Sequence, residues 1–104
     1  MTPAMPMDQM RETATGLAAT LKALAHRDRL LLLCRLSAGE ASVGELSEAS
    51  GLRQAAVSQH LAVLREAGAV AARTDQQSRI YSISDPQVRR MFEALCMICT
   101  EETT

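Results

Sequence analysis

Residues 51–64, GLRQAAVSQHLAVL, constrain the fold of this chain most, because they predict a turn followed by a two-faced helix. Val57, Leu61 and Leu64 recur at the i, i+4, i+7 spacing of a helix side that faces a core. The opposite side carries only small or polar residues, namely Ala55, Ser58, Gln59 and Ala62. Small residues allow close approach, and Ser and Gln both donate and accept hydrogen bonds, so this side suits base edges in a DNA major groove. The alternative is an ordinary solvated helix face.

A second, shorter helix is predicted just before this one. Ser42 and Glu45 have the spacing of a capping box, which begins a helix near Val43. Its inner face is expected to contain Val43, Leu46 and Ala49. A turn containing Gly51 then leads into the second helix, and Gly68 supplies the C-terminal stop of that helix. Two short helices joined in this way predict a helix-turn-helix.

The segments around this unit complete a predicted winged helix. Residues 69–73 and 79–83 have strand character and flank a polar hairpin tip at 74–78. Apolar periodicity predicts three more helices, at residues 8–24, 26–37 and about 85–100. The fold class is therefore mainly α with a small β-hairpin wing. We expect a disordered lead at 1–7, one domain at 8–100 and an acidic tail at 101–104. We also expect nearly complete burial of the four leucines at 30–33.

The distribution of charge favours DNA binding more than the total charge does. A net charge of −1 is mild evidence against a nucleic-acid partner. However, residues 51–80 contain four arginines and two acids, so the positive charge lies on the predicted reading segment. No apolar run approaches membrane length, and the N-terminus lacks the pattern of a signal peptide. We therefore expect a cytoplasmic protein with reduced cysteines and no membrane partner.

Three cysteines, Cys34, Cys96 and Cys99, are the candidates for reactive chemistry. They could be small core residues, a thiol switch joined directly or through inserted sulfur, or ligands of a soft metal. Cys96 and Cys99 form a Cys-x-x-Cys pair, but in thiol oxidoreductases such a pair opens a helix, whereas this pair stands near a helix end. With no βαβ pattern and no acid–base constellation, we expect no enzymatic activity.

Four segments resemble the ArsR/SmtB family of dimeric bacterial repressors: LAHRDRL at 24–30, SVGEL at 42–46, VSQHLAVLREAG at 57–68 and RIY at 79–81. The resemblance spans about residues 17–100. Family members that sense metal on the first helix of the helix-turn-helix carry a Cys-x-Cys there, and those that bind zinc on the last helix use Asp and His pairs. Neither pattern is present. The chain is most similar to the persulfide- and redox-sensing branch that includes BigR, SqrR and HlyU, which carries one Cys in the second helix and one near the end of the last.

This resemblance implies a homodimer formed by the first and last helices, with two recognition helices in successive major grooves of a pseudo-palindromic operator of double-stranded DNA. The expected DNA contacts are Arg53, Gln54, Ala55, Ser58, Gln59, His60, Arg65, Arg73, Gln76, Gln77 and Arg79. Reactive sulfur species are the implied inducer, and a di- or polysulfide bridge between Cys34 and Cys99 is the implied switch. No cofactor or metal is implied.

Two departures from that branch keep alternatives open. Cys96 is an additional thiol, and the spacing from Cys34 to Cys99 is about one residue short, so Cys96 is also a candidate partner of Cys34. The alternative inducer is arsenite or another soft metal ion held by Cys34, Cys96 and Cys99. His26 and His60 are expected to be helix-start or DNA-side residues rather than metal ligands. A protein-interaction module, in which the helix-turn-helix only packs, is the alternative without DNA binding.

Overall fold

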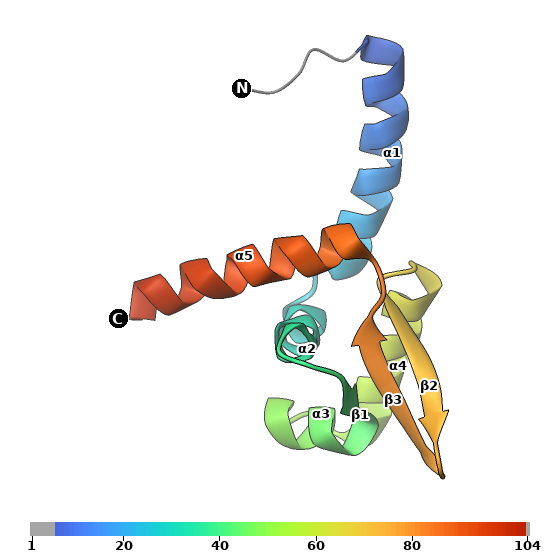
Figure 1. Cartoon of the computed structure of the whole chain (residues 1–104), viewed down its shortest axis with the longest axis vertical. Helices are drawn as coiled ribbons and strands as arrows, with labels where there is room; N and C mark the ends of the chain where they lie inside the picture. The colour runs from blue at the N-terminus through green and yellow to red at the C-terminus, as the bar shows by residue number, and fades with distance from the viewer. Residues whose placement is uncertain (1–5, 104) are drawn as a thin grey trace.

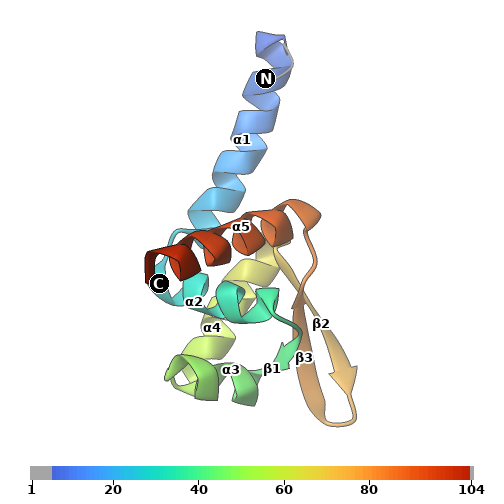
Figure 2. The ribbon, with the colours of Figure 1, turned by 60° about the vertical axis from the view of Figure 1, so that its left-hand side comes forward.

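The computed structural model describes the backbone of residues 6–103 and the side chains of residues 6–98, and it confirms a winged helix (Figure 1). The elements are α1 (Met7–Leu24), α2 (Arg27–Ser37), β1 (Ala41–Ser42), α3 (Val43–Ser50), α4 (Gln54–Glu66), β2 (Val70–Asp75), β3 (Ser78–Ile83) and α5 (Pro86–Thr103). The strands form one antiparallel sheet in the order β1-β3-β2. In both views α1 projects from the body and α5 crosses α2 (Figures 1 and 2). Within the described chain, every helix is too short or too polar to span a bilayer.

Local hydrogen bonds fix the helix-turn-helix as the sequence predicts. Ser42 Oγ accepts from the Glu45 amide at 3.1 Å, and Glu45 Oε1 accepts from the Ser42 amide at 3.0 Å, which completes the capping box. Gly51 ends α3 with a φ of 77°, a left-handed conformation that glycine adopts without a Cβ penalty. The Ser47 hydroxyl then donates to the Leu52 carbonyl at 2.5 Å. The three-residue turn before α4 is thus held at both ends.

The core gathers around the inner side of α4. Val57, Leu61 and Leu64 have no exposed surface, which confirms the apolar stripe. β2 and β3 contribute alternate inward residues, and the first half of α5 contributes Val88 and Phe92. The remaining members of the core are Leu24, Leu32, Leu33, Leu36, Ala41, Leu46, Ala69, Val70, Tyr81, Ile83, Val88 and Phe92.

Two burial predictions are wrong for this chain. Leu32 and Leu33 are fully buried, but Leu30 and Leu31 are 38% and 47% exposed, because the elements that the structure describes leave one side of α2 uncovered. Ala49 is also exposed. Each step of three residues turns a helix by about 300°, so the third member of an i, i+3, i+6 series has rotated about 120° from the first.

The wing extends further than predicted. β2 and β3 remain paired as far as Asp75 and Ser78, so the tip is Gln76 and Gln77 rather than residues 74–78. Backbone pairing needs no apolar side chain, and the polar ends therefore continue the ladder. Gln76 closes the turn with a φ of 57°.

One additional strand and two helix boundaries also differ from the predictions. β1 is an additional strand that pairs with β3, and two residues are too few to give a recognisable strand pattern. α5 continues to Thr103 instead of ending near residue 100, since no Gly or Pro stops it, and the expected tail at 101–103 is helical. α1 already includes Met7, whereas residues 1–5 of the expected lead lie outside the described residues.

Candidate DNA-binding interface and cysteine cluster

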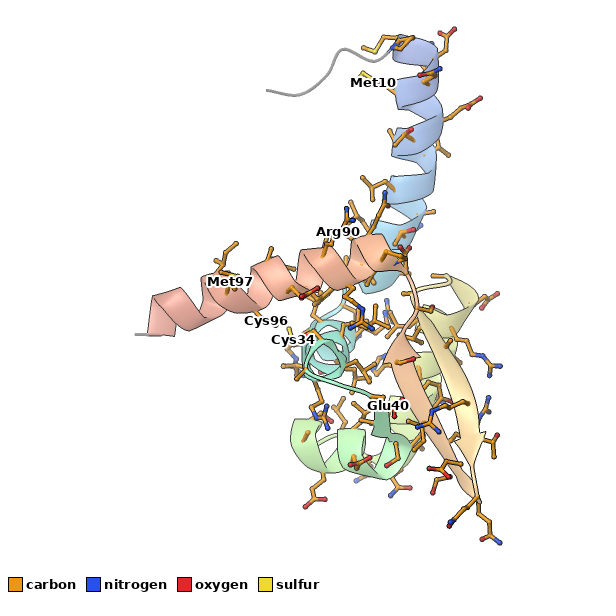
Figure 3. All side chains as sticks on the ribbon, viewed as in Figure 1. Met10, Cys34, Glu40, Arg90, Cys96 and Met97 are labelled. Atoms are coloured by element: carbon orange, nitrogen blue, oxygen red, sulfur yellow. The ribbon has the colours of Figure 1, made fainter. Side chains whose placement is uncertain are left out.

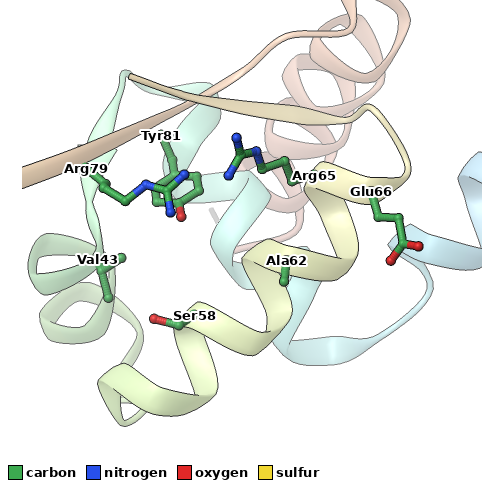
Figure 4. Close-up of a pocket in the computed structure, with 7 residues that line it drawn as sticks. All are labelled: Val43, Ser58, Ala62, Arg65, Glu66, Arg79 and Tyr81. Atoms are coloured by element: carbon green, nitrogen blue, oxygen red, sulfur yellow. The ribbon is translucent and has the colours of Figure 1, made fainter. Parts of the chain in front are cut away.

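A groove of about 570 Å³ separates the outer side of α4 from the wing, which consists of β2, β3 and their turn (Figure 4). It is lined by Val43, Ser58, Ala62, Arg65, Glu66, Arg79 and Tyr81, and we call it the α4–wing groove. A neighbouring hollow of about 340 Å³ extends toward the starts of α3 and α4 and includes Gln54 and Arg79. The structure therefore brings recognition-helix and wing residues that were predicted separately onto one concave surface.

The predicted outer side of α4 is exposed. Gln54, Ala55, Ser58 and Gln59 all lie open to solvent, and Arg53 occupies the N-cap position just before them. The small residue Ala62 follows Ser58 by one turn and is also exposed. Another surface can therefore approach the backbone on this side closely. The start of the helix on the same side also carries hydrogen-bonding groups.

Two arginines face each other across the α4–wing groove. Figure 4 shows the side chains of Arg65 from α4 and Arg79 from β3 pointing toward one another, while Glu66 points away. The Arg79 guanidinium carbon lies 5.8 Å from the centre of the Tyr81 ring, a cation–π distance that orients it. Neither arginine forms an ion pair with any described residue. Two unpaired cations across an open groove favour an anion such as a phosphate between them.

Arg73, which we also expected to contact DNA, has a different electrostatic environment. It donates to both carboxylate oxygens of Glu40, at 2.6 and 3.3 Å, and lies 3.9 Å from Asp75. The hydrogen bond from Arg73 lowers the pKa of Glu40, and the same bond raises the pKa of Arg73. The positive charge of Arg73 is therefore largely offset by Glu40. The two residues are 33 positions apart in the sequence, so the sequence alone does not reveal the pair.

His60 does not lie on the outer side of α4 beside Ser58, and its DNA contact stays a prediction. It follows Ser58 by two residues, which places it about 200° around the helix. Its ring centre lies 4.7 Å from that of His26, and its Nε2 atom lies 3.8 Å from Asp28 Oδ2. His26 is a helix-start residue, as predicted, because its Nδ1 accepts the Asp28 amide at 3.1 Å.

Cys34 and Cys96 lie close together where α5 crosses α2 (Figure 3). Both side chains are partly buried. The Ser37 hydroxyl donates to the Cys34 carbonyl at 2.6 Å and lies 3.5 Å from Cys96 Sγ. Sequence reasoning missed Ser37, whose only signal was its position one turn after Cys34. The side chain of Cys99 lies outside the described residues, so the Cys34–Cys99 pair stays a prediction.

Large apolar side chains are exposed on α1 and on the second half of α5. On α1 they are Met7, Met10, Leu17 and Leu21, and on α5 they are Leu95, Met97 and Ile98. Met10 and Met97, labelled in Figure 3, lie on helices that extend beyond the core. Exposed apolar surface on this scale commonly marks an interaction site.

Comparison with known proteins identifies the family. The model of the bacterial regulatory protein arsR family matches residues 26–72, from just before α2 into β2. The biofilm growth-associated repressor of Agrobacterium fabrum is 43% identical over 99 residues, which cover 94% of this chain and 85% of that protein. The chain belongs to the ArsR family. It is thus a winged-helix transcriptional regulator, a class of DNA-binding proteins that are not enzymes.

Two solved structures match this ArsR-family chain closely. Reduced HlyU from Vibrio cholerae has a TM-score of 0.83 and 41% identity, and the match covers 86% of this chain and 95% of that one. The homodimeric winged helix-turn-helix DNA-binding domain of a possible ArsR-family regulator from Mycobacterium bovis has a TM-score of 0.77 and 28% identity, with 99% and 94% covered.

Proposed function

We propose that this ArsR-family regulator is a homodimeric repressor that leaves its operator when Cys34 becomes bridged to a cysteine of α5 by a di- or polysulfide. The observation that carries this proposal is the meeting of α2 and α5 at Cys34 and Cys96, with Ser37 in contact with both residues. Two relatives support it by name: one is called a repressor, and the structure of the other is described as reduced.

Operator binding would use the α4–wing groove and the adjacent helix start. Gln54, Ser58 and Gln59 would read base edges, because their side chains are exposed on the side of α4 that carries no bulky residue. Arg65 and Arg79 would hold phosphates. Phosphate contacts make operator affinity fall steeply as salt is added.

A homodimer would cover the exposed apolar sides of α1 and α5. Both helices extend past the core and carry several large apolar side chains, and exposed apolar surface of this kind marks an interaction site. Two-fold symmetry then presents two α4 helices, which predicts a pseudo-palindromic operator. The M. bovis relative is described as homodimeric.

The proposed chemistry needs only a persulfide as oxidant. One thiolate attacks the outer sulfur of a low-molecular-weight persulfide, takes up that sulfur and releases the parent thiol. The second cysteine then attacks the inner sulfur of the protein persulfide, which forms a disulfide and expels hydrogen sulfide. Longer bridges keep one or two extra sulfur atoms and consume further persulfide as the oxidant.

The bridge would act through α5. Val88 and Phe92 hold the first half of this helix in the core, whereas Leu95, Met97 and Ile98 in the second half are exposed. A bond from this second half to α2 would shift the proposed dimer surface and so change the spacing of the two α4 helices. The required coupling is small, because about 1.4 kcal/mol changes affinity tenfold.

Mass spectrometry combined with operator binding tests the proposal. Reduced protein is exposed separately to glutathione persulfide, glutathione disulfide and hydrogen peroxide, and cross-linked peptides are mapped. We expect the persulfide to link Cys34 to an α5 cysteine and to weaken operator binding. The Cys34→Ser variant should remain bound, and comparison of C96S with C99S identifies the partner. Release of Cys34→Ser by persulfide as readily as the parent protein would refute the switch.

The same cluster supports one alternative inducer. Cys96 lies near Cys34, and Cys99 follows one turn later along the backbone of α5, so three thiolates from two helices could bind arsenite or another soft metal. Arsenite titration distinguishes the two: release by arsenite without release by persulfide would favour the metalloid site.

A further inference from the structure

A second group of ligand-type side chains lies away from both the cysteine cluster and the α4–wing groove. It consists of His26, Asp28 and His60, and one ligand atom of each lies within 4.8 Å of the others. His26 and Asp28 come from the start of α2, whereas His60 comes from the middle of α4. His60 Nε2 and Asp28 Oδ2 are 3.8 Å apart. We call these residues the histidine cluster.

We infer that the histidine cluster binds a borderline divalent cation such as Zn²⁺ through two imidazoles and one carboxylate. With bonds of about 2.1 Å, two ligand atoms of a tetrahedral Zn²⁺ site are about 3.4 Å apart. The His60 and Asp28 ligand atoms, 3.8 Å apart, would have to approach by a few tenths of an ångström, and rotation of the imidazoles would bring in the third ligand. Water would complete a tetrahedral shell.

The partial burial of His60 and Asp28 favours a cation between them, because their side chains are only 17% and 16% exposed. Burial lowers the pKa of His60, the positive charges of His26 and Arg29 lower it further, and Asp28 opposes them. The Asp28 side chain is only 16% exposed, so its charge is weakly screened by solvent.

Two neighbouring arginines moderate the affinity. Arg27 Nε lies 3.2 Å from Asp28 Oδ1, but the Arg27 side chain is 85% exposed and can withdraw into solvent. Arg29 is held by the Ala23 carbonyl at 2.5 Å and stays near the cluster. This fixed cation weakens binding relative to a closed structural zinc site. Soft ions would still prefer the cysteines, because imidazole and carboxylate suit harder ions.

The bound ion would join the start of α2 to the back of α4, on the side of the recognition helix away from the α4–wing groove. Because no cysteine takes part, this site is independent of the proposed sulfur switch. Binding to the folded state alone would stabilise it by RT ln(1 + c/Kd), where c is the ion concentration, so the melting temperature would rise with the logarithm of ion concentration above Kd.

The experiment uses the full chain with Cys34, Cys96 and Cys99 all changed to Ser, so that no thiol binds the probe. The chain contains two histidines, and both belong to the cluster, so every histidine signal reports on this site. We expect Zn²⁺ to shift the ¹⁵N resonances of both imidazoles and to saturate at one ion per chain. Co²⁺ should give visible bands without a thiolate charge-transfer band.

Two variants of this parent separate ligation from folding. His26→Asn retains an N-capping side chain, and His60→Phe retains a packed ring, while each removes one imidazole ligand. Each should weaken Zn²⁺ binding at least tenfold. Unchanged imidazole resonances in the parent at saturating Zn²⁺, or parent-like affinity in both variants, would overturn the site. If a variant fails to fold, the imidazole resonances of the parent decide.

Discussion

Replacing Arg79 with alanine should make operator binding less sensitive to salt, whereas replacing Arg73 should have little effect. Both arginines belong to the wing and are exposed. Arg79 faces Arg65 across the α4–wing groove and forms no ion pair with a described residue. Arg73 is already bound by both oxygens of Glu40. A phosphate therefore gains a full charge contact from Arg79 and must displace a carboxylate to gain one from Arg73.

The magnitude follows from counterion release. Each phosphate neutralised contributes about 0.9 to the slope of log affinity against log salt concentration. A homodimer carries two copies of Arg79, so the variant should lose about 1.8 from the slope. Between about 50 and 200 mM salt, a fourfold range, the parent protein should therefore lose roughly twelvefold more affinity than Arg79→Ala.

Fluorescence anisotropy with a labelled operator, repeated on reduced protein at several salt concentrations, measures these slopes. Arg73→Ala is the matched control in the same wing. Glu40→Gln supplies the converse test, because it frees Arg73 and should steepen the slope. The reasoning would be refuted if Arg79→Ala kept the parent slope, or if Arg73→Ala lowered it equally.

Three further predictions concern stability. Leu61→Ala empties a fully buried position and should cost about 2–5 kcal/mol in urea unfolding, and a loss below about 1 kcal/mol would contradict the assigned core. Gly51→Ala places a side chain at a φ of 77° and should cost about 1–2 kcal/mol by the same assay, so unchanged stability would argue against the left-handed turn. The amide of Ser42 lowers the pKa of Glu45 below 4.5, so the stabilisation by Glu45 is complete above about pH 4.5 and is lost as pH falls through its folded-state pKa. Glu45→Ala should therefore be less stable than the parent near neutral pH and approach it in acid, and a stability gap that is independent of pH would exclude the capping box as its source.

The parts of the fold that depend on neighbouring residues in the chain could be predicted from the sequence. The Ser42–Glu45 capping box, the left-handed Gly51 and the buried stripe of α4 each need only a few adjacent positions. The exposure of Gln54, Ala55, Ser58 and Gln59 follows from the same helical period. These signals placed the recognition helix, which is the centre of the candidate site.

The features that were missed depend on partners distant in sequence. Neither the capture of Arg73 by Glu40 nor the contact of Ser37 with Cys96 has a local pattern. The exposure of Leu31 was missed for a different reason. An apolar sequence pattern does not distinguish burial in the protein's own core from burial against a partner. The inward position of His60 could have been predicted from the sequence, since the helical period alone places it opposite Ser58.

β1, although only two residues long, links the helix-turn-helix to the wing. Ala41 and Ser42 pair with Tyr81 and Ile80 of β3, and Ser42 also caps α3. The first helical turn of α3 is thereby linked by backbone pairing to β3, a strand of the wing. A displacement of α3 would therefore be passed directly to β3, so that contacts made by the helix-turn-helix and by the wing change together.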